Sequence, residues 1–188
     1  PDAVTWTRRP AASISSLKSV TRGGGIWIAV GSGGAILRST NGIQWSNAPS
    51  PTDYDLNSVA FGNGLFVAVG DRLFPDGTLI TSPDGLHWTL RHQFIGKNLR
   101  SVTFANQRFL ATANDGVVLE STDGIQWKYG EATPNMDYRG NLRAATYAAG
   151  TWVVAGNSGM VATWSAIAGG QTHLLATYEN QHGIVHFK

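Results

Sequence analysis

The chain has 188 residues, enough for one domain of ordinary size, and its 14 Lys and Arg against 12 Asp and Glu give a net charge of +2. The cations are scattered along the sequence, which excludes the clustered basic footprint of a nucleic-acid-binding protein. No run of about eighteen apolar residues is present, so no transmembrane helix is expected. The absence of cysteine excludes disulfides, thiol nucleophiles and cysteine metal sites.

The first expected element is a short strand at residues 3–8. From Leu17 onward the sequence repeats itself, because each unit opens with Leu-x-Ser-Val, at Leu17, Leu56 and Leu99, and in a weaker form at Leu142. The underlying period is 39 residues. Self-similarity at about forty residues is typical of solenoids and propellers.

Within the first unit, apolar runs at residues 17–22, 26–30 and 35–39 are separated by Gly, Asn or Ser, and a fourth short strand follows at Trp45. This composition indicates strands and turns rather than helices. The corresponding runs of the later units lie at residues 56–61, 65–69 and 78–82, at 99–104, 109–113 and 117–121, and at 142–147, 152–155 and 160–163.

A motif Ser-x-Asp/Asn-Gly-x-x-Trp closes three of the four units. Asn or Asp followed by Gly favours a tight hairpin in which both residues take positive φ. We expect the Ser to hydrogen-bond within this hairpin and the Trp to cover it. The motif residues are Ser39, Asn41, Gly42 and Trp45, then Ser82, Asp84, Gly85 and Trp88, then Ser121, Asp123, Gly124 and Trp127.

Four short strands per unit predict an all-β fold, a β-propeller of four four-stranded blades spanning residues 1–165. A blade of this kind cannot bury both faces alone, and radial stacking leaves only short, protected edges. The fourth unit lacks the motif, since Gly170 stands where its Trp would be, while Trp6 lies 11 residues before Leu17 as Trp45 lies before Leu56. We therefore predict that residues 3–8 complete the last blade and close the ring; the alternative is that Trp6 belongs to a further, upstream blade.

Residues 166–188 fall outside the repeat. They are expected to form a Gly-Gly linker and a hairpin of two strands, at residues 173–179 and 184–187. Such a C-terminal extension is a candidate arm for homo-oligomerisation or docking. It could equally be the start of another blade.

The motif resembles the Asp-box, or sialidase-type, propeller repeats, including those of photosystem II assembly-factor propellers and of many bacterial and phage surface proteins. The resemblance covers about residues 3–165. The common Asp-box has one more residue between Asp and Gly, so no particular enzyme family follows from it. In that family the box is a structural hairpin at the periphery, which implies that the motif residues here are scaffolding.

Catalytic and metal sites are not expected. A sialidase needs three arginines, a Tyr activated by Glu and an acidic proton donor, and Glu occurs only at positions 120, 131 and 179. Glu120 lies at a periodic strand position, where an exposed peripheral carboxylate is expected. The histidines match no zinc pattern. We expect no enzyme, no metal and no cofactor.

Recognition by loops on a rigid scaffold remains. Insertions of four residues enlarge two connections of the same face, one at residues 71–74 and one within residues 129–140. Exposed aromatic residues and arginines anchor interfaces or stack on sugars. The candidate ligand-binding residues are Tyr54, Arg72, Phe74, His92, Tyr129, Tyr138 and Arg139. The expected partner is a glycan or a protein, outside the cell, at its surface or in a virion; the alternative is a structural propeller that docks within a larger assembly.

Overall fold

The computed structural model describes residues 7–9, 15–72, 77–91, 96–129, 140–166, 172–180 and 183–186, with the backbone alone described from residue 164 onward. The fold is all-β, as the repeat predicts. Four antiparallel sheets follow one another in chain order, and we refer to them as blades 1 to 4.

The first two blades have the same plan, with strands in sequence order. Blade 1 consists of β1 (Leu17–Gly23), β2 (Ile26–Gly31), β3 (Ile36–Ser39) and β4 (Ser46–Asn47), and a 3-10 turn, η1 (Ser32–Gly34), joins β2 to β3. Blade 2 consists of β5 (Leu56–Gly62), β6 (Leu65–Gly70), β7 (Thr78–Ser82) and β8 (Thr89–Leu90).

Blade 3 repeats this plan and blade 4 extends it. Blade 3 consists of β9 (Leu99–Ala105), β10 (Arg108–Ala113), β11 (Val118–Ser121) and β12 (Lys128–Tyr129). Blade 4 consists of β13 (Leu142–Ala148), β14 (Thr151–Gly156), β15 (Val161–Ala166), β16 (Thr172–Asn180) and β17 (Gly183–His186), with η2 (Asn157–Gly159) between β14 and β15. The first strand of every blade begins at the Leu that the repeat predicts.

The fourth blade corrects two expectations. β16 pairs with β15 from Val161↔Thr177 to Ala166↔Thr172, so the place beside β15 is filled from the C-terminal side. The prediction that residues 3–8 supply this strand is therefore wrong; of these residues, 3–6 lie outside the described ones. β16 and β17 do form the expected hairpin, but it continues the sheet of blade 4 and does not stand apart as a separate extension from residue 166.

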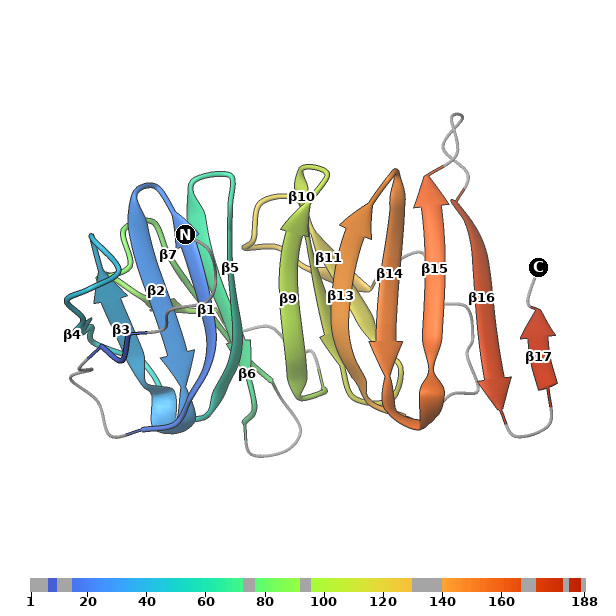
Figure 1. Cartoon of the computed structure of the whole chain (residues 1–188), viewed down its shortest axis with the longest axis horizontal. Helices are drawn as coiled ribbons and strands as arrows, with labels where there is room; N and C mark the ends of the chain where they lie inside the picture. The colour runs from blue at the N-terminus through green and yellow to red at the C-terminus, as the bar shows by residue number, and fades with distance from the viewer. Residues whose placement is uncertain are drawn as a thin grey trace.

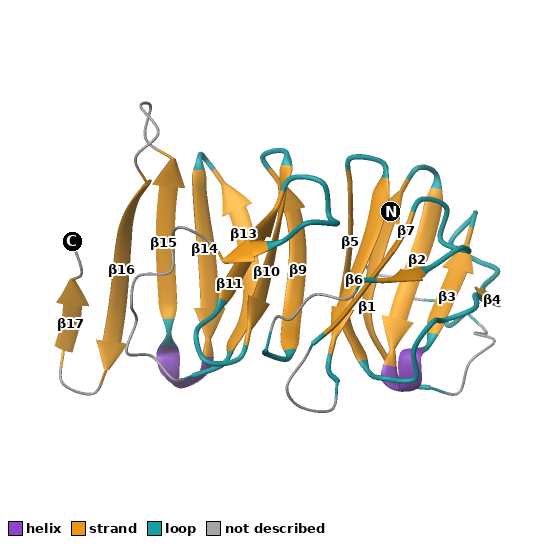
Figure 2. Cartoon of the chain, turned by 180° about the vertical axis from the view of Figure 1, so that it is seen from behind, coloured by secondary structure: helices purple, strands orange, loops and turns teal. Residues whose placement is uncertain are grey.

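The blades stack side by side, with the first strands β1, β5, β9 and β13 in contact from one blade to the next. Blades 1 and 4 lie at opposite ends of the row (Figure 1), and the view from behind gives the same order (Figure 2). The core is formed between blades, by three buried apolar clusters, each made of residues from two consecutive blades. Hydrophobic burial thus holds each blade to its neighbour.

Candidate functional site

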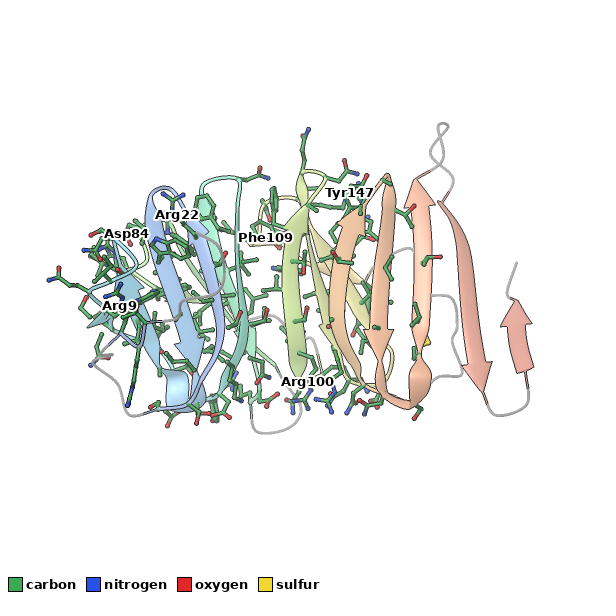
Figure 3. The ribbon with its side chains drawn as sticks, viewed as in Figure 1. Arg9, Arg22, Asp84, Arg100, Phe109 and Tyr147 are labelled. Atoms are coloured by element: carbon green, nitrogen blue, oxygen red, sulfur yellow. The ribbon has the colours of Figure 1, made fainter. Side chains whose placement is uncertain are left out.

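One end of the blades carries the connections between the second and third strands and the connections that lead into the next blade. We call this end the loop face. It is the face on which the sequence places both insertions, and Arg100 lies at this end while Arg22 and Tyr147 lie at the opposite one (Figure 3).

The first strand of every blade enters from the loop face with a β-bulge. The register between first and second strands skips one residue in each blade, and that residue is always the second of its strand. A bulge re-aims the side chain of the extra residue, and bulges are common beside functional sites. We call these four positions the bulge row; they are Lys18, Asn57, Arg100 and Arg143.

A backbone hydrogen bond fixes the bulge in the same way in every blade. The amide that follows the second strand donates to the carbonyl that precedes the first strand, at 2.9 to 3.1 Å. The pairs are Ser32 to Ser16, Asp71 to Asp55, Asn114 to Asn98 and Asn157 to Asn141. The bulge row is therefore held by main-chain geometry, which leaves its side chains open to variation.

Polar contacts join blades 1 and 2 at the bulge row. Nζ of Lys18 donates to Oδ2 of Asp55 at 2.8 Å and to Oδ1 of Asn57 at 2.9 Å. The backbone N–H of Gly33 also donates to Asp55, at 2.9 Å. The side-chain hydrogen bond from Lys18 and then the amide of Gly33 hold the pKa of Asp55 below its usual value, so this carboxylate is ionised at neutral pH.

The contacts continue into blade 3. Nδ2 of Asn57 donates to Oδ1 of Asp71 at 3.0 Å and to the carbonyl of Leu99 at 2.9 Å. Nη1 of Arg100 lies 3.2 Å from Oδ1 of Asp71, and its Nε donates to Oδ1 of Asn114 at 2.7 Å. Asp71 is thus shared by two residues of the bulge row, one from each of two blades.

Arg143 differs from the other two cations of the row. Its Nε donates to Oδ1 of Asn157 at 3.0 Å, and both residues are exposed. Within the described part of the chain, no carboxylate forms an ion pair with Arg143, whereas Lys18 and Arg100 each have one. Among the described residues, the positive charge of the row is therefore least compensated at Arg143.

The structure brings together two of the residues that the sequence selects. Cζ of Arg72 lies 6.0 Å from the centre of the Tyr54 ring, a cation–π contact between the connection into blade 2 and the enlarged connection after β6. The backbone N–H of Arg72 donates to Oδ1 of Asn98 at 3.4 Å. This pair lies on the loop face beside the bulge row.

Of the other selected residues, the structure describes only Tyr129. Tyr129 is exposed on β12, the outermost strand of blade 3. Phe74, His92, Tyr138 and Arg139 lie outside the described residues, as does Trp6. The bulge row is not among the residues selected from the sequence, although the variable position of Leu-x-Ser-Val, occupied by Lys, Asn, Arg and Arg, is the signal that marks it.

The repeated motif is a structural hairpin. In blade 2, Oγ of Ser82 accepts from the amide of Gly85 at 2.8 Å, and Oδ1 of Asp84 accepts from the amides of Leu86 and His87, each at 2.9 Å. Ser39 with Asn41, and Ser121 with Asp123, make the same contacts. The expected hydrogen bonding of the Ser is confirmed.

The turn itself differs from the expected one. Only the glycines Gly42, Gly85 and Gly124 take positive φ, of 71° to 73°, while the preceding Asn or Asp does not. The Asn or Asp side chain instead accepts two backbone N–H groups, which produces a longer turn. As a result the Trp precedes the short outer strand of its blade. The Trp45 and Trp127 indole N–H groups close the turn by donating to the carbonyls of Gly42 and Gly124.

Glu120 also departs from expectation. It is buried, at 7% exposure, and Nη1 of Arg108 donates to its Oε2 at 2.7 Å. Burial without a partner would be costly for a carboxylate, and the cross-strand arginine provides that partner. Among the described residues, no group of three His, Asp or Glu side chains has the arrangement of a metal site, and no helix is long and apolar enough to span a membrane.

Comparisons with known proteins relate the chain to others by its fold. No protein-family model and no curated protein matches the sequence. Among solved structures, YCF48 from Cyanidioschyzon merolae superposes with a TM-score of 0.67 at 16% identity, covering 93% of this chain and 60% of that one. YCF48 bound to D1 peptide superposes with a TM-score of 0.65 at 17% identity, covering 87% and 53%.

A third similar structure is the computationally designed Ika4 protein, with a TM-score of 0.62 at 14% identity, covering 86% of this chain and all of that one. At these identities the likeness shows the propeller-type fold alone. The chain spans little more than half the length of the two YCF48 chains it matches.

Proposed function

We propose that this chain is a non-catalytic binding propeller that holds an extended, acidic polypeptide segment along the bulge row of the loop face. The observation that carries the proposal is the bulge itself, which directs a polar or basic side chain from the same position of all four blades. A scaffold that repeats this geometry while varying the residue can match side chains at regular intervals along a ligand.

The spacing of the blades suits an extended peptide. Packed sheets lie about 10 Å apart, and an extended chain advances about 3.3 Å per residue, so neighbouring blades meet roughly every third residue of a peptide that crosses them. Lysine offers a point charge and arginine a fork of donors that matches a carboxylate. Residues at that interval would meet Lys18, Asn57, Arg100 and Arg143 in turn, and acidic ones would pair with the three cations.

A polypeptide ligand also has support from the comparisons, because one similar structure is YCF48 bound to D1 peptide. The tight hairpins support assigning the repeats to the Asp-box class. They would form a variant that has one residue fewer between Asp and Gly than the common Asp-box. A location outside the cell, at its surface or in a virion belongs to the same proposal.

The test uses a fluorescein-labelled peptide of about ten residues with Glu at every third position, and fluorescence anisotropy at low and at physiological salt. Arg143→Ala removes a cation whose described side-chain partner is neutral, so the loss of binding is not masked by a stranded carboxylate. Loss of a charge-assisted hydrogen bond is expected to weaken binding about tenfold. Raising the salt concentration is expected to weaken it further.

Arg22→Ala is the matched control. Arg22 is an exposed cation at the opposite end of the blades, with its Cζ 5.6 Å from the centre of the Trp27 ring. Its removal changes the net charge equally and is expected to leave binding unchanged. Equal losses in both variants, or no binding by the wild-type chain, would overturn the proposal.

A carbohydrate ligand is the alternative within the same class, since Tyr54 lies on the loop face. A glycan array probed with the wild-type chain and with Tyr54→Ala separates the two ligands. A saturable sugar signal that Tyr54→Ala abolishes would show that the ligand is a glycan and not a peptide. The alternative of a structural propeller that docks within a larger assembly is favoured by a separate observation, the exposed apolar residues on the outer faces of blades 1 and 4.

A further inference from the structure

Within the described part of the chain, no blade packs on the face of blade 1 that points away from blade 2, although its sequence is that of a buried surface. Leu17 is 44% exposed and Val20 is 58% exposed. Leu56 and Val59 occupy the same positions in blade 2, and Leu99 and Val102 in blade 3, and these four residues are buried. The Leu-x-Ser-Val motif thus persists where none of the four described blades packs on it.

This face is hollowed into an open groove of about 460 Å³. Its lining includes Leu17, Val20, Ala29, Leu37 and Trp45. The corresponding residues of blade 2 are Leu56, Val59, Ala68, Ile80 and Trp88, and all five belong to the cluster that blade 1 covers. The groove is therefore one half of a blade-to-blade interface. We call it the leading face.

The far face of blade 4 is the other half of such an interface. Val161 is 43% exposed, whereas Ile36, Leu79 and Val118, at the same position of blades 1 to 3, are buried. Val153 is also partly exposed, while its counterpart Ile28 in blade 1 is buried. We call this surface the trailing face.

We propose that the leading face of one chain binds the trailing face of a second copy, and that two copies close head to tail into one ring. Inside the chain these two kinds of surface already pack together: Ile36 shares a cluster with Val59, and Leu79 shares one with Val102. The same pairing between copies joins Val161 to the partner's Val20. A head-to-tail contact that closes gives a discrete oligomer.

A hydrogen bond of the internal interfaces can also be repeated between copies. Oγ1 of Thr103 donates to the carbonyl of Ala145 in the next blade at 2.9 Å. Thr146 occupies the Thr103 position in blade 4 and is exposed. In the paired copies it donates to the backbone carbonyl of the partner's Val20, which occupies the Ala145 position.

A terminal blade that ends a repeat array in solvent carries a polar outer face. The leading face is polar at Arg22, where the later blades have Phe61, Phe104 and Tyr147, but it keeps Leu17 and Val20 at its centre. Two copies supply eight blades, which lies within the range of four to eight that closed propellers adopt. A second copy therefore fits both faces at once.

Sedimentation equilibrium and native mass spectrometry of the 188-residue chain test the proposal. The expected mass is twice the 20.1 kDa of one chain. Val20→Asp and Val161→Asp place a charge on the leading and the trailing face, and each variant is expected to give the single-chain mass with an unchanged far-UV circular dichroism spectrum. Both side chains are exposed in the single chain, so neither change disturbs its own core.

Leu86→Asp is the control, because Leu86 is an exposed apolar residue in the turn between β7 and β8 of blade 2, a blade whose two faces are covered by blades 1 and 3. It is expected to keep the mass of the pair. A wild-type chain that is monomeric up to about 100 µM, well above the dissociation constants of stable pairs, would overturn the proposal. So would a pair that survives both Asp substitutions, or a ladder of larger species in place of a closed pair.

Discussion

The ring of Phe104, in blade 3, lies against the backbone of Gly62, in blade 2, so closely that a Cβ atom on Gly62 would come within 2.1 Å of it. Phe61 stands over Gly23 of blade 1 in the same way, at 1.9 Å. The aromatic residue and the glycine are adjacent positions of the repeat. Each interface between the first three blades is therefore built from an aromatic ring and a glycine that has no side chain.

Gly62→Ala is expected to lower the free energy of unfolding by about 1 to 3 kcal/mol, because the added methyl group overpacks a rigid interface. Urea unfolding followed by tryptophan fluorescence measures the change. Adding Phe104→Leu should make the alanine less costly than it is in the wild-type background. Additive effects of the two substitutions would contradict the direct contact.

Ser82→Ala tests the hairpin. The Ser82 hydroxyl is buried, accepts from the amide of Gly85 at 2.8 Å and donates to Oδ1 of Asp84 at 3.1 Å. Its removal leaves a buried amide without its acceptor, which is expected to cost about 1 to 2 kcal/mol of unfolding free energy. Ser46→Ala, on the exposed outer strand of blade 1, is the control and should change stability by less than about 0.5 kcal/mol.

The repeat in the sequence predicted the blades and the starts of their first strands. It did not predict the β-bulges or the fourth strand of blade 4, which depend on how the strands pair. Leu17, Leu56, Leu99 and Leu142 begin their strands as expected, because burial of that position in the three later blades imposes a strong side-chain pattern. The sequence places β16 in a separate arm because the motif that leads into the fourth strand of the other blades is missing from the fourth unit, although β15 and β16 are consecutive strands that pair from Ala166↔Thr172 onward.

The site was predicted only in outline. The insertions and residue types point to the loop face and to Tyr54 and Arg72 as separate candidates, whereas the contact between these two residues is seen only in the structure. The bulge row was not predicted, although the bulge brings the Leu and Val of Leu-x-Ser-Val, three residues apart, onto the same face of the blade, which is a break in strict strand alternation. Variation at its position, from Lys18 to Asn57, resembled that of any exposed residue.

Stability should fall in acid through the hairpin carboxylates. Amide donation from His87, together with its ring, lowers the pKa of Asp84 well below the usual value. Burial acts to raise the pKa of Asp123, but amide donation from Gln126 and Ile125 outweighs it and the pKa is lowered. A carboxylate whose pKa is lower in the folded than in the unfolded state stabilises the fold at pH values above its unfolded-state pKa of about 3.9. This contribution is lost as the pH falls from there towards the folded-state pKa.

Blade 1 supplies the matched variant for this prediction, since Asn41 makes the same amide contacts without titrating. Asp84→Asn with Asp123→Asn should therefore keep the hairpins and flatten the loss of stability below about pH 4. Thermal unfolding between pH 2 and pH 7 measures the slope. An unchanged acid slope in the double variant would show that other groups carry it.

Arg108 and Glu120 allow a full double-mutant cycle. Arg108→Ala should lower the unfolding free energy by about 1 to 3 kcal/mol, because it strands a buried carboxylate. Thr81 and Thr163 occupy the Glu120 position in blades 2 and 4, so Glu120→Thr introduces a residue that the fold already accepts there. Adding Glu120→Thr to Arg108→Ala should recover most of the loss in urea unfolding. If Arg108→Ala alone left stability unchanged, the carboxylate would have another partner, and the ion pair would not be what keeps Glu120 inside blade 3.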